Sequence, residues 1–436
     1  MLKFRDNYDY LFLLLIGFSI FLYFFGFWIN ENSAGGGEGD FQNTWRNLQT
    51  FKDNNLMNAL KITSMADSST FQSSRIPGVY IFHKFFNPFT ENALQFRLSV
   101  FLFSFLVPIS FFYALKMNLK KTKPILIALI ASLIFLSPYF RTSAIWGNEE
   151  NFGLLTLILS YIFLQSFLKE KKSTKRFIYL NLICIFSSLC IYFDQKLAFV
   201  PGICFLIILL NSSYNFEKLY LIFLYILFSL PIIYLFNLWG GIMPPVDAES
   251  RGILQGKLYF QHIGYSMSII SFYLLPLIFL INKFFKENYK NLFSRKLIWF
   301  YTLMVLYSIY FIFFYEIENE IYLGKGVFFK LSQILFENPY IQKIFLSVIF
   351  IVSSLILFFT AQNKHENVLI FLFLIITSII YWPVLQEYFD PLILILFFTF
   401  LKVKIKIDNR IISLIYFFFL TFYSFSFFYY TKIISI

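Results

Sequence analysis

Cysteine, histidine and charge are scarce in this chain of 436 residues, which has three cysteines, three histidines and 14% charged residues. Cys184, Cys190 and Cys204 all fall inside apolar segments, without the spacing of metal ligands. Their placement excludes a disulfide framework or a cysteine-based metal site, and indicates buried small apolar side chains. So little charge also leaves no room for a separate soluble domain of ordinary size.

Several catalytic motifs are missing as well. The sequence contains no H-E-x-x-H, no G-x-S-x-G and no Cys/His pair, so it lacks the minimum parts of a zincin protease or a serine hydrolase. The short basic loops contain nothing that resembles a nucleotide-binding loop. Chemistry that depends on a nucleotide is therefore not indicated.

Apolar residues dominate instead, at 58% of the chain. A hydrocarbon core of about 30 Å needs roughly 20 apolar residues in a helix, and only helices or closed barrels satisfy their backbone groups in lipid. The pattern predicts an all-α, polytopic transmembrane helical bundle of about 13 spans, with residues 1–436 as one integral-membrane domain. The expected spans are 10–29, 95–115, 124–140, 152–168, 177–193, 197–211, 219–236, 263–282, 297–315, 344–361, 367–382, 388–401 and 411–430.

Positive charge alternates between the connecting loops and predicts the orientation. The formal net charge of +12 would suggest nucleic acid in a soluble protein, but here Lys and Arg gather in short loops between apolar runs. We therefore expect no nucleic-acid partner and a cytoplasmic N-terminus, with residues 10–29 as a retained helix and not a signal peptide. The loops that this places inside contain, for example, Lys116, Lys120, Lys121, Lys123, Lys169, Lys171, Lys172, Lys175 and Arg176.

Three long loops are then expected on the outer face, at 30–94, 237–262 and 316–343. In the third, the apolar spacing from Val327 to Phe336 suits a helix that lies in the membrane interface. A substrate gate and a plain amphipathic connector are both compatible with that helix.

The first outer loop has the richest polar chemistry. Three consecutive glycines, Gly35 to Gly37, precede Glu38 and Asp40 in this loop, and two carboxylates in such a turn could act as a general base or hold a divalent cation. The alternative is a flexible, solvated loop end. The same loop continues to Arg75 before a Pro-Gly turn, where a guanidinium could hold a phosphate or simply anchor lipid head groups.

Other outer turns are short and charged. Insertion of a carboxylate into the membrane is unfavourable by about 2.5 to 3.5 kcal/mol on insertion scales, so the presence of carboxylates at the ends of spans needs an explanation. Snorkelling to the interface would explain each one singly, but all of them fall on one predicted face. The carboxylates concerned are Glu149 and Glu150 at a helix N-terminus, Asp194 beside Lys196 between two spans, and Asp390 beside Tyr388 near the end. The longer middle loop contains a group of cations, among them Arg251, and His262. The cation cluster of the middle loop suits an anionic lipid head, whereas His262 alone is also typical of a hydrogen-bonded interfacial residue.

These features resemble the GT-C superfamily of integral-membrane glycosyltransferases, which use polyprenyl-phosphate sugars as donors. The resemblance rests on Glu38-Gly39-Asp40 after the first span, on the stretch that ends Arg75-Ile76-Pro77-Gly78-Val79-Tyr80, and on the turn from Trp146 to Asn151. The chain has only a few residues after its last span, and thus departs from family members with a large C-terminal soluble domain.

The resemblance implies an inverting transfer of sugar to a lipid-linked, glycan or protein acceptor at the outer face of the membrane. It makes Asp40 the catalytic base, with Glu38 supporting it or binding a cation such as Mg or Mn, and Glu149 or Glu150 placing the acceptor or a metal. Arg75, Arg251 and His262 become the candidates for the donor phosphate. The abundance of Phe, Ile, Lys and Asn suggests an AT-rich genome, which favours a bacterial inner membrane with the site facing the periplasm or exterior.

Two other classes remain open. A transporter or lipid flippase would be expected to have paired repeats and broken helices with charges near the membrane midplane, whereas here the ionisable residues lie at the ends of spans. A polymerase or ligase of lipid-linked glycans would place its essential basic residues in a late outer loop, where Lys325 and Lys330 are candidates. A scaffold without chemistry would leave the glycine-rich acidic turn unexplained.

Overall fold

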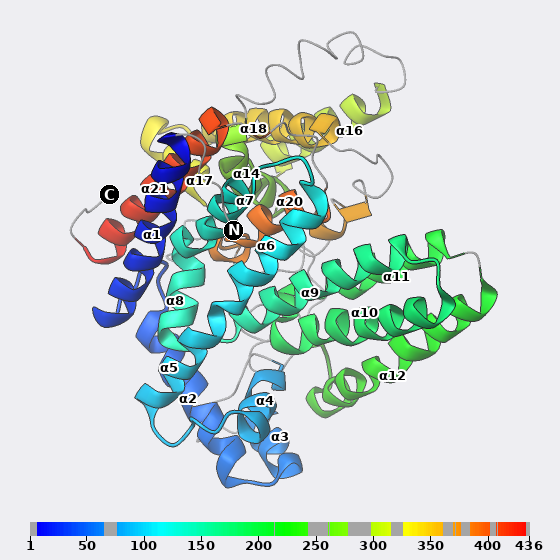
Figure 1. Cartoon of the computed structure of the whole chain (residues 1–436). Helices are drawn as coiled ribbons and strands as arrows, with labels where there is room; N and C mark the ends of the chain where they lie inside the picture. Colours follow the sequence, from blue (N-terminus) through cyan, green and yellow to red (C-terminus); the bar gives the residue numbers. More distant parts are fainter. Residues whose placement is uncertain are drawn as a thin grey trace. The chain divides into compact units, whose positions relative to one another are not determined.

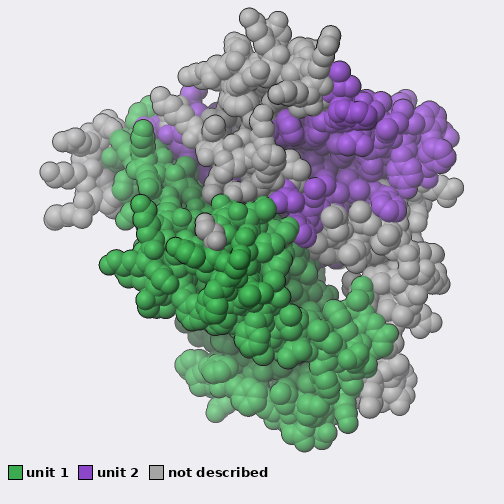
Figure 2. Space-filling view, turned by 90° about the vertical axis from the view of Figure 1, so that its right-hand side faces the viewer, with its two compact units in different colours: residues 1–257, 419–436 green, residues 258–418 purple. Residues whose placement is uncertain are grey.

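The computed structural model describes residues 7–64, 76–212, 214–242, 260, 262–277, 298–314, 326–360, 369–370, 372–375, 384–401, 407 and 409–432. Throughout these residues the regular structure is helical, without a strand, as the sequence predicts (Figure 1). The chain divides into two compact units, one formed by 1–257 and 419–436 and the other by 258–418 (Figure 2). That residues 1–436 form a single integral-membrane domain stays a prediction.

Within the described residues, seven helices are long and apolar enough to cross a membrane. The seven are Tyr8–Trp28, Ala93–Asn118, Glu150–Lys169, Ser173–Phe193, Asn215–Trp239, Pro339–Phe358 and Asn409–Tyr430. The membrane class is thus supported, whereas the expected count of about 13 spans is not confirmed. Two further expected spans are shorter apolar helices, Gln195–Asn211 and Ile298–Phe314, and the expected span 367–382 lies largely outside the described residues.

Two expected spans differ in form from the prediction. The segment 124–140 is not one straight helix, because Pro124–Leu136 and Pro138–Trp146 meet at an angle of 65°. Ser137 is extended (φ −75°, ψ 118°), as expected for a residue before proline, whose ring disfavours the helical region at the preceding position. In 388–401 the helix covers only seven residues, Leu392–Phe398, which is far short of the bilayer thickness.

The first unit contains the N-terminal helices and the end of the last one. Helix α9 packs on α6, α10 and α11, and α10 also contacts α12, so that these helices lie side by side (Figure 1). Helix α1 packs on α7 and α8, and α5 packs on α8. The bounds are α1 Asn7–Trp28, α5 Ala93–Ser104, α6 Leu106–Asn118, α7 Pro124–Ser132, η1 Leu133–Leu136, α8 Pro138–Trp146, α9 Glu150–Lys169, α10 Ser173–Phe193, η2 Gln195–Leu197, α11 Phe199–Asn211, α12 Asn215–Trp239 and α21 Asn409–Tyr430, of which 419–430 belong here.

The first long connection, 30–94, folds into three short helices where it is described. They are α2 Gly37–Asp53, α3 Leu56–Ser64 and α4 Gly78–Phe86. Helix α2 buries Phe41, Thr44, Leu48 and Phe51, which recur at the spacing of one helix face, and it packs on α3, α4 and α8. The glycine-rich turn expected at 35–40 therefore ends earlier than the sequence suggested, and Glu38 and Asp40 already belong to a helix.

In the second unit, α14 packs against α17, α18 and α20, and α16 packs on α18. Helix α17 confirms that the amphipathic stretch after residue 326 is helical. The bounds are α14 His262–Leu274, η4 Leu275–Leu277, α16 Ile298–Phe314, α17 Val327–Leu335, α18 Pro339–Thr360, η6 Gln386–Tyr388, α20 Leu392–Phe398 and the first part of α21.

Candidate functional site

Helix α2 presents the two candidate acids in its first turn. Gly35, Gly36 and Gly37 precede them with φ angles of 82°, 70° and 45°, a left-handed backbone that glycine adopts without strain. A side chain on Gly36 would collide with the carboxylate of Asp40, so that carboxylate lies directly over the glycine backbone. Glu38 is exposed and Asp40 is half-buried. Acids in the first turn also interact favourably with the helix dipole.

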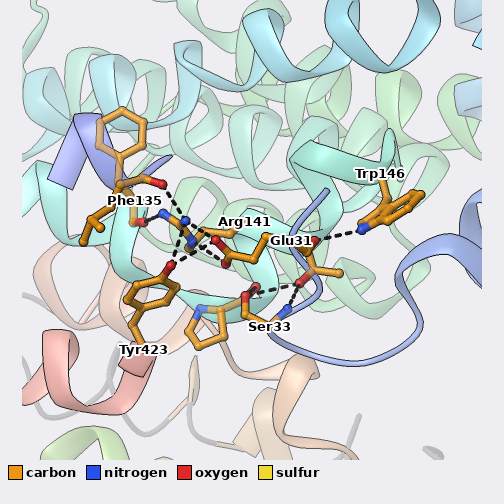
Figure 3. Close-up of polar contacts among 9 residues, drawn as sticks. Glu31, Ser33, Phe135, Arg141, Trp146 and Tyr423 are labelled. Carbon is orange, nitrogen blue, oxygen red and sulfur yellow. Dashed lines mark hydrogen bonds and ion pairs between the residues drawn. The ribbon is translucent and has the colours of Figure 1, made fainter. Parts of the chain in front are cut away.

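A buried ion pair anchors the chain just upstream of these glycines (Figure 3). Glu31 and Arg141 are both 0% exposed in their side chains, and the guanidinium holds both carboxylate oxygens, with Nε 2.8 Å from Oε1. Tyr423 closes the network, because its hydroxyl lies 3.1 Å from Nη2 of Arg141 and donates to Oε2 of Glu31 at 3.0 Å. Arg141 also donates to the carbonyl oxygens of Leu22 (2.8 Å) and Phe135 (2.9 Å).

Further contacts fix the backbone that leaves this ion pair. The Trp146 indole donates to the Glu31 carbonyl at 2.8 Å, and Ser33 N–H donates to the Thr142 hydroxyl at 3.1 Å (Figure 3). From α21, the Ser426 hydroxyl donates to the Ser33 carbonyl at 2.5 Å. Three elements distant in the chain, α1, α8 and α21, are thus tied to the segment that leads to Asp40.

The turn between α8 and α9 faces α2. Gly147 ends α8 in a left-handed conformation (φ 74°), and Glu149 is the N-cap of α9. The Thr44 hydroxyl, one turn after Asp40 on the same face of α2, lies 3.5 Å from the Asn148 side-chain oxygen. The structure therefore brings the acidic end of α2 to the same region as the Glu149 turn.

Glu150 belongs to a second polar cluster at the start of α9. Its carboxylate accepts hydrogen bonds from Tyr139 (2.5 Å) and Ser143 (2.8 Å) of α8. The Lys196 ammonium donates to the Tyr139 hydroxyl at 3.0 Å, and lies 3.9 Å from Glu150 and 3.8 Å from Asp194. Three of the residues expected at the outer face thus meet in one partly buried network, and Tyr139, which links them, belongs to no sequence motif.

His83 in α4 is almost completely buried, at 1% exposed. Its ring stacks edge-on to Phe96 and Phe152, with centroids 4.8 Å and 5.1 Å away. The Asn87 amide nitrogen, a donor, lies 3.0 Å from Nδ1. Desolvation lowers the pKa of His83 to about 3, so the imidazole is neutral near pH 7 and cannot serve as a cation for phosphate.

The other predicted residues lie outside the described residues or in the second unit. Arg75 and Arg251 lie outside the described residues. His262, Tyr388 and Asp390 belong to the second unit, where His262 and Asp390 are buried and Tyr388 is half-buried. There Tyr273 contacts Asp390, and its hydroxyl lies 3.5 Å from the Gln386 amide.

Metal binding gains no support from the geometry. In the part of the chain that the structure describes, no three His, Cys, Asp or Glu side chains converge as ligands for a metal ion. The divalent cation expected near Glu38 or Glu149 therefore stays a prediction.

Comparison with known proteins found no family model, no curated protein and no solved structure that matches this chain. The site residues that the sequence did not single out include Glu31, Arg141, Tyr139, Ser143 and Tyr423. Glu31 lies 110 positions from Arg141 and 392 from Tyr423, so that only the fold brings the three together.

Proposed function

We propose that this chain is an inverting membrane glycosyltransferase of the GT-C type, which takes its sugar from a polyprenyl-phosphate donor. The observation that carries the proposal is the placement of Asp40. Its carboxylate lies at the first turn of α2, directly over the backbone of Gly36, and its helix packs beside the acidic α8–α9 turn. The upstream segment is fixed by a fully buried ion pair.

The chemistry assigned to Asp40 is that of a general base. Its carboxylate accepts the proton of an acceptor hydroxyl while the hydroxyl oxygen attacks the anomeric carbon of the sugar. The bond from that carbon to the phosphate oxygen breaks, and the lipid phosphate leaves with the electron pair. Because the sugar arrives already activated on its lipid, the reaction needs no nucleotide at the outer face. The acceptor is a lipid-linked sugar, a glycan or a protein.

Substitution of Asp40 tests this role, with Asp53 as a matched control at the exposed far end of the same helix. Asp40→Asn removes the base but keeps the shape, and we expect sugar transfer to fall by about 100-fold or more, because general-base catalysis contributes roughly 10²–10⁴-fold. Asp53→Asn should transfer sugar as the wild type does. Normal transfer by Asp40→Asn, at equal protein abundance in the membrane, would remove Asp40 from the mechanism.

A lipid flippase is the second candidate, and one observation favours it. The helix pair Pro124–Leu136 and Pro138–Trp146 is broken at 65° and carries the buried Arg141, and broken helices with buried charges are typical of transporters. Movement of a fluorescent polyprenyl-phosphate lipid across vesicles, without any sugar transfer, would support this alternative over the transferase.

A further inference from the structure

Two arginines hold the same turn at the end of α1, and they differ in how many of their hydrogen-bond donors have a partner. Arg141 is completely buried and neutralised by Glu31. Arg97, in the second turn of α5, holds the neighbouring residue: its Nη2 donates to the Asn30 side-chain oxygen at 2.7 Å, and its Nε donates to the Ile145 carbonyl at 2.9 Å. Arg97 is only half-buried.

The Arg97 guanidinium is held in a fixed orientation. It stacks on the Trp146 ring at 4.2 Å from the centroid, with Phe27 and Phe41 at 5.7 Å and 5.8 Å. A guanidinium on aromatic faces keeps its charge and loses little additional entropy when it forms further hydrogen bonds. This rigidity is the kind of preorganisation that a binding site requires.

Some N–H donors of this guanidinium form no hydrogen bond with the described residues. Arginine has five N–H donors, and the two hydrogen bonds to Asn30 and Ile145 leave both donors of Nη1 without a hydrogen bond to any described residue. No described carboxylate lies within ion-pair distance of Arg97. The acid that acts on it electrostatically is Glu38, which is exposed at the start of the Asp40 helix.

Other cations near α2 are less suited to bind an anion. Arg141 is fully buried, Lys196 is paired with Glu150 and Asp194, and Arg46 is exposed on α2. Arg97 is thus a fixed cation with unused donors beside the helix that carries Asp40, to which it is linked by its contact with the Phe41 ring.

We propose that Arg97 binds an anionic phosphate oxygen, and that the phosphate belongs to the polyprenyl-phosphate substrate. The inference rests on the proposed function, because it places the leaving phosphate next to the acceptor base. A guanidinium bound to that phosphate stabilises the negative charge that gathers there as the sugar departs. The same chemistry would accept free phosphate, so the two sources need separate measurements.

A binding assay with the purified protein in lipid nanodiscs distinguishes a lipid phosphate from free phosphate. It uses three probes: sugar-free polyprenyl phosphate, the uncharged polyprenol and inorganic phosphate. We expect polyprenyl phosphate to bind at least 10-fold more tightly than either of the others. Arg97→Gln should weaken its binding by at least 10-fold, Arg97→Lys by less, and the control Arg46→Gln not at all. Equal affinity of wild type and Arg97→Gln, or equal affinity for polyprenol and polyprenyl phosphate, would overturn the proposal. If inorganic phosphate binds as tightly as the lipid, the lipid is not the source.

Because Arg97 also holds Asn30 and Ile145, its replacement could unfold the turn. A second measurement therefore uses the wild type: polyprenyl phosphate should protect Arg97, but not Arg46, from phenylglyoxal, as read by mass spectrometry. Modification of Arg97 at the same rate with and without the lipid would contradict the site. These experiments involve no sugar, so Arg97-dependent binding without any transfer would leave this inference standing and remove the transferase.

Discussion

At the level of single residues, some of the site could be predicted from sequence and some could not. Asp40, Glu150 and Lys196 stand out because carboxylates and amines next to apolar spans are costly and call for an explanation. The partner of Arg141 could not be found in this way, since Glu31 is 110 positions away and belongs to no motif. Tyr423 was hidden for the same reason among the aromatic residues of the last helix.

The buried ion pair makes a prediction about stability. Glu31→Gln keeps the shape but leaves the Arg141 charge buried and uncompensated, and breaking such a pair costs about 3–5 kcal/mol. The exposed Glu91→Gln is a matched control, with an expected change within about 0.5 kcal/mol. Denaturant unfolding in detergent micelles measures both. A Glu31→Gln protein as stable as Glu91→Gln would show that the pair does not hold the turn.

His83 predicts a dependence on pH. The folded protein keeps this imidazole neutral because its pKa is about 3, whereas the unfolded chain binds a proton below about 6.5. The contribution of the neutral His83 to the free energy of unfolding is therefore fully present above pH 6.5. It is lost as the pH falls from 6.5 toward 3, by at most about 1.4 kcal/mol per pH unit. Comparing the unfolding free energies of wild type and His83→Gln between pH 7 and pH 5 tests this. An equal loss in both proteins would assign the effect to other groups.

At the level of elements, apolar runs predicted most helices well, because a helix that faces lipid or core must be apolar over many turns. Breaks were harder to place. Pro138 could have marked the bend after Leu136, since a residue before proline leaves the helical region. The three glycines favour a longer turn than the one observed, whereas the helical spacing of Phe41, Thr44 and Leu48 agrees with the actual start of α2 at Gly37.

The glycine turn allows a matched pair of substitutions. Gly36→Ala forces a side chain into a left-handed backbone, at about 1–2 kcal/mol, and into the Asp40 carboxylate. We expect it to lower both the melting temperature and the transfer rate. Gly39→Ala meets nothing within 4 Å inside the same helix, and should be neutral or stabilising by up to about 1 kcal/mol with transfer retained. Equal behaviour of the two variants would show that the Gly36 backbone does not shape the site.

At the level of the whole molecule, composition alone was enough to predict a helical membrane protein, because so many apolar residues have no other stable arrangement at this length. The number of spans, the cytoplasmic N-terminus and the outward-facing site remain predictions. These three predictions depend on how the helices pair and on where the bilayer lies. The hydropathy of successive residues gives no information on either point. The described first unit nevertheless shows how residues 31, 141 and 423 come together, which no linear pattern reveals.

The decisive measurement incubates the purified protein in vesicles with a panel of polyprenyl-phosphate sugars and candidate acceptors, with and without a chelator. We predict transfer of at least one sugar, with inversion at the anomeric carbon and loss of activity in Asp40→Asn. Absence of transfer from every donor, while the protein still binds or flips the lipid, would contradict the glycosyltransferase.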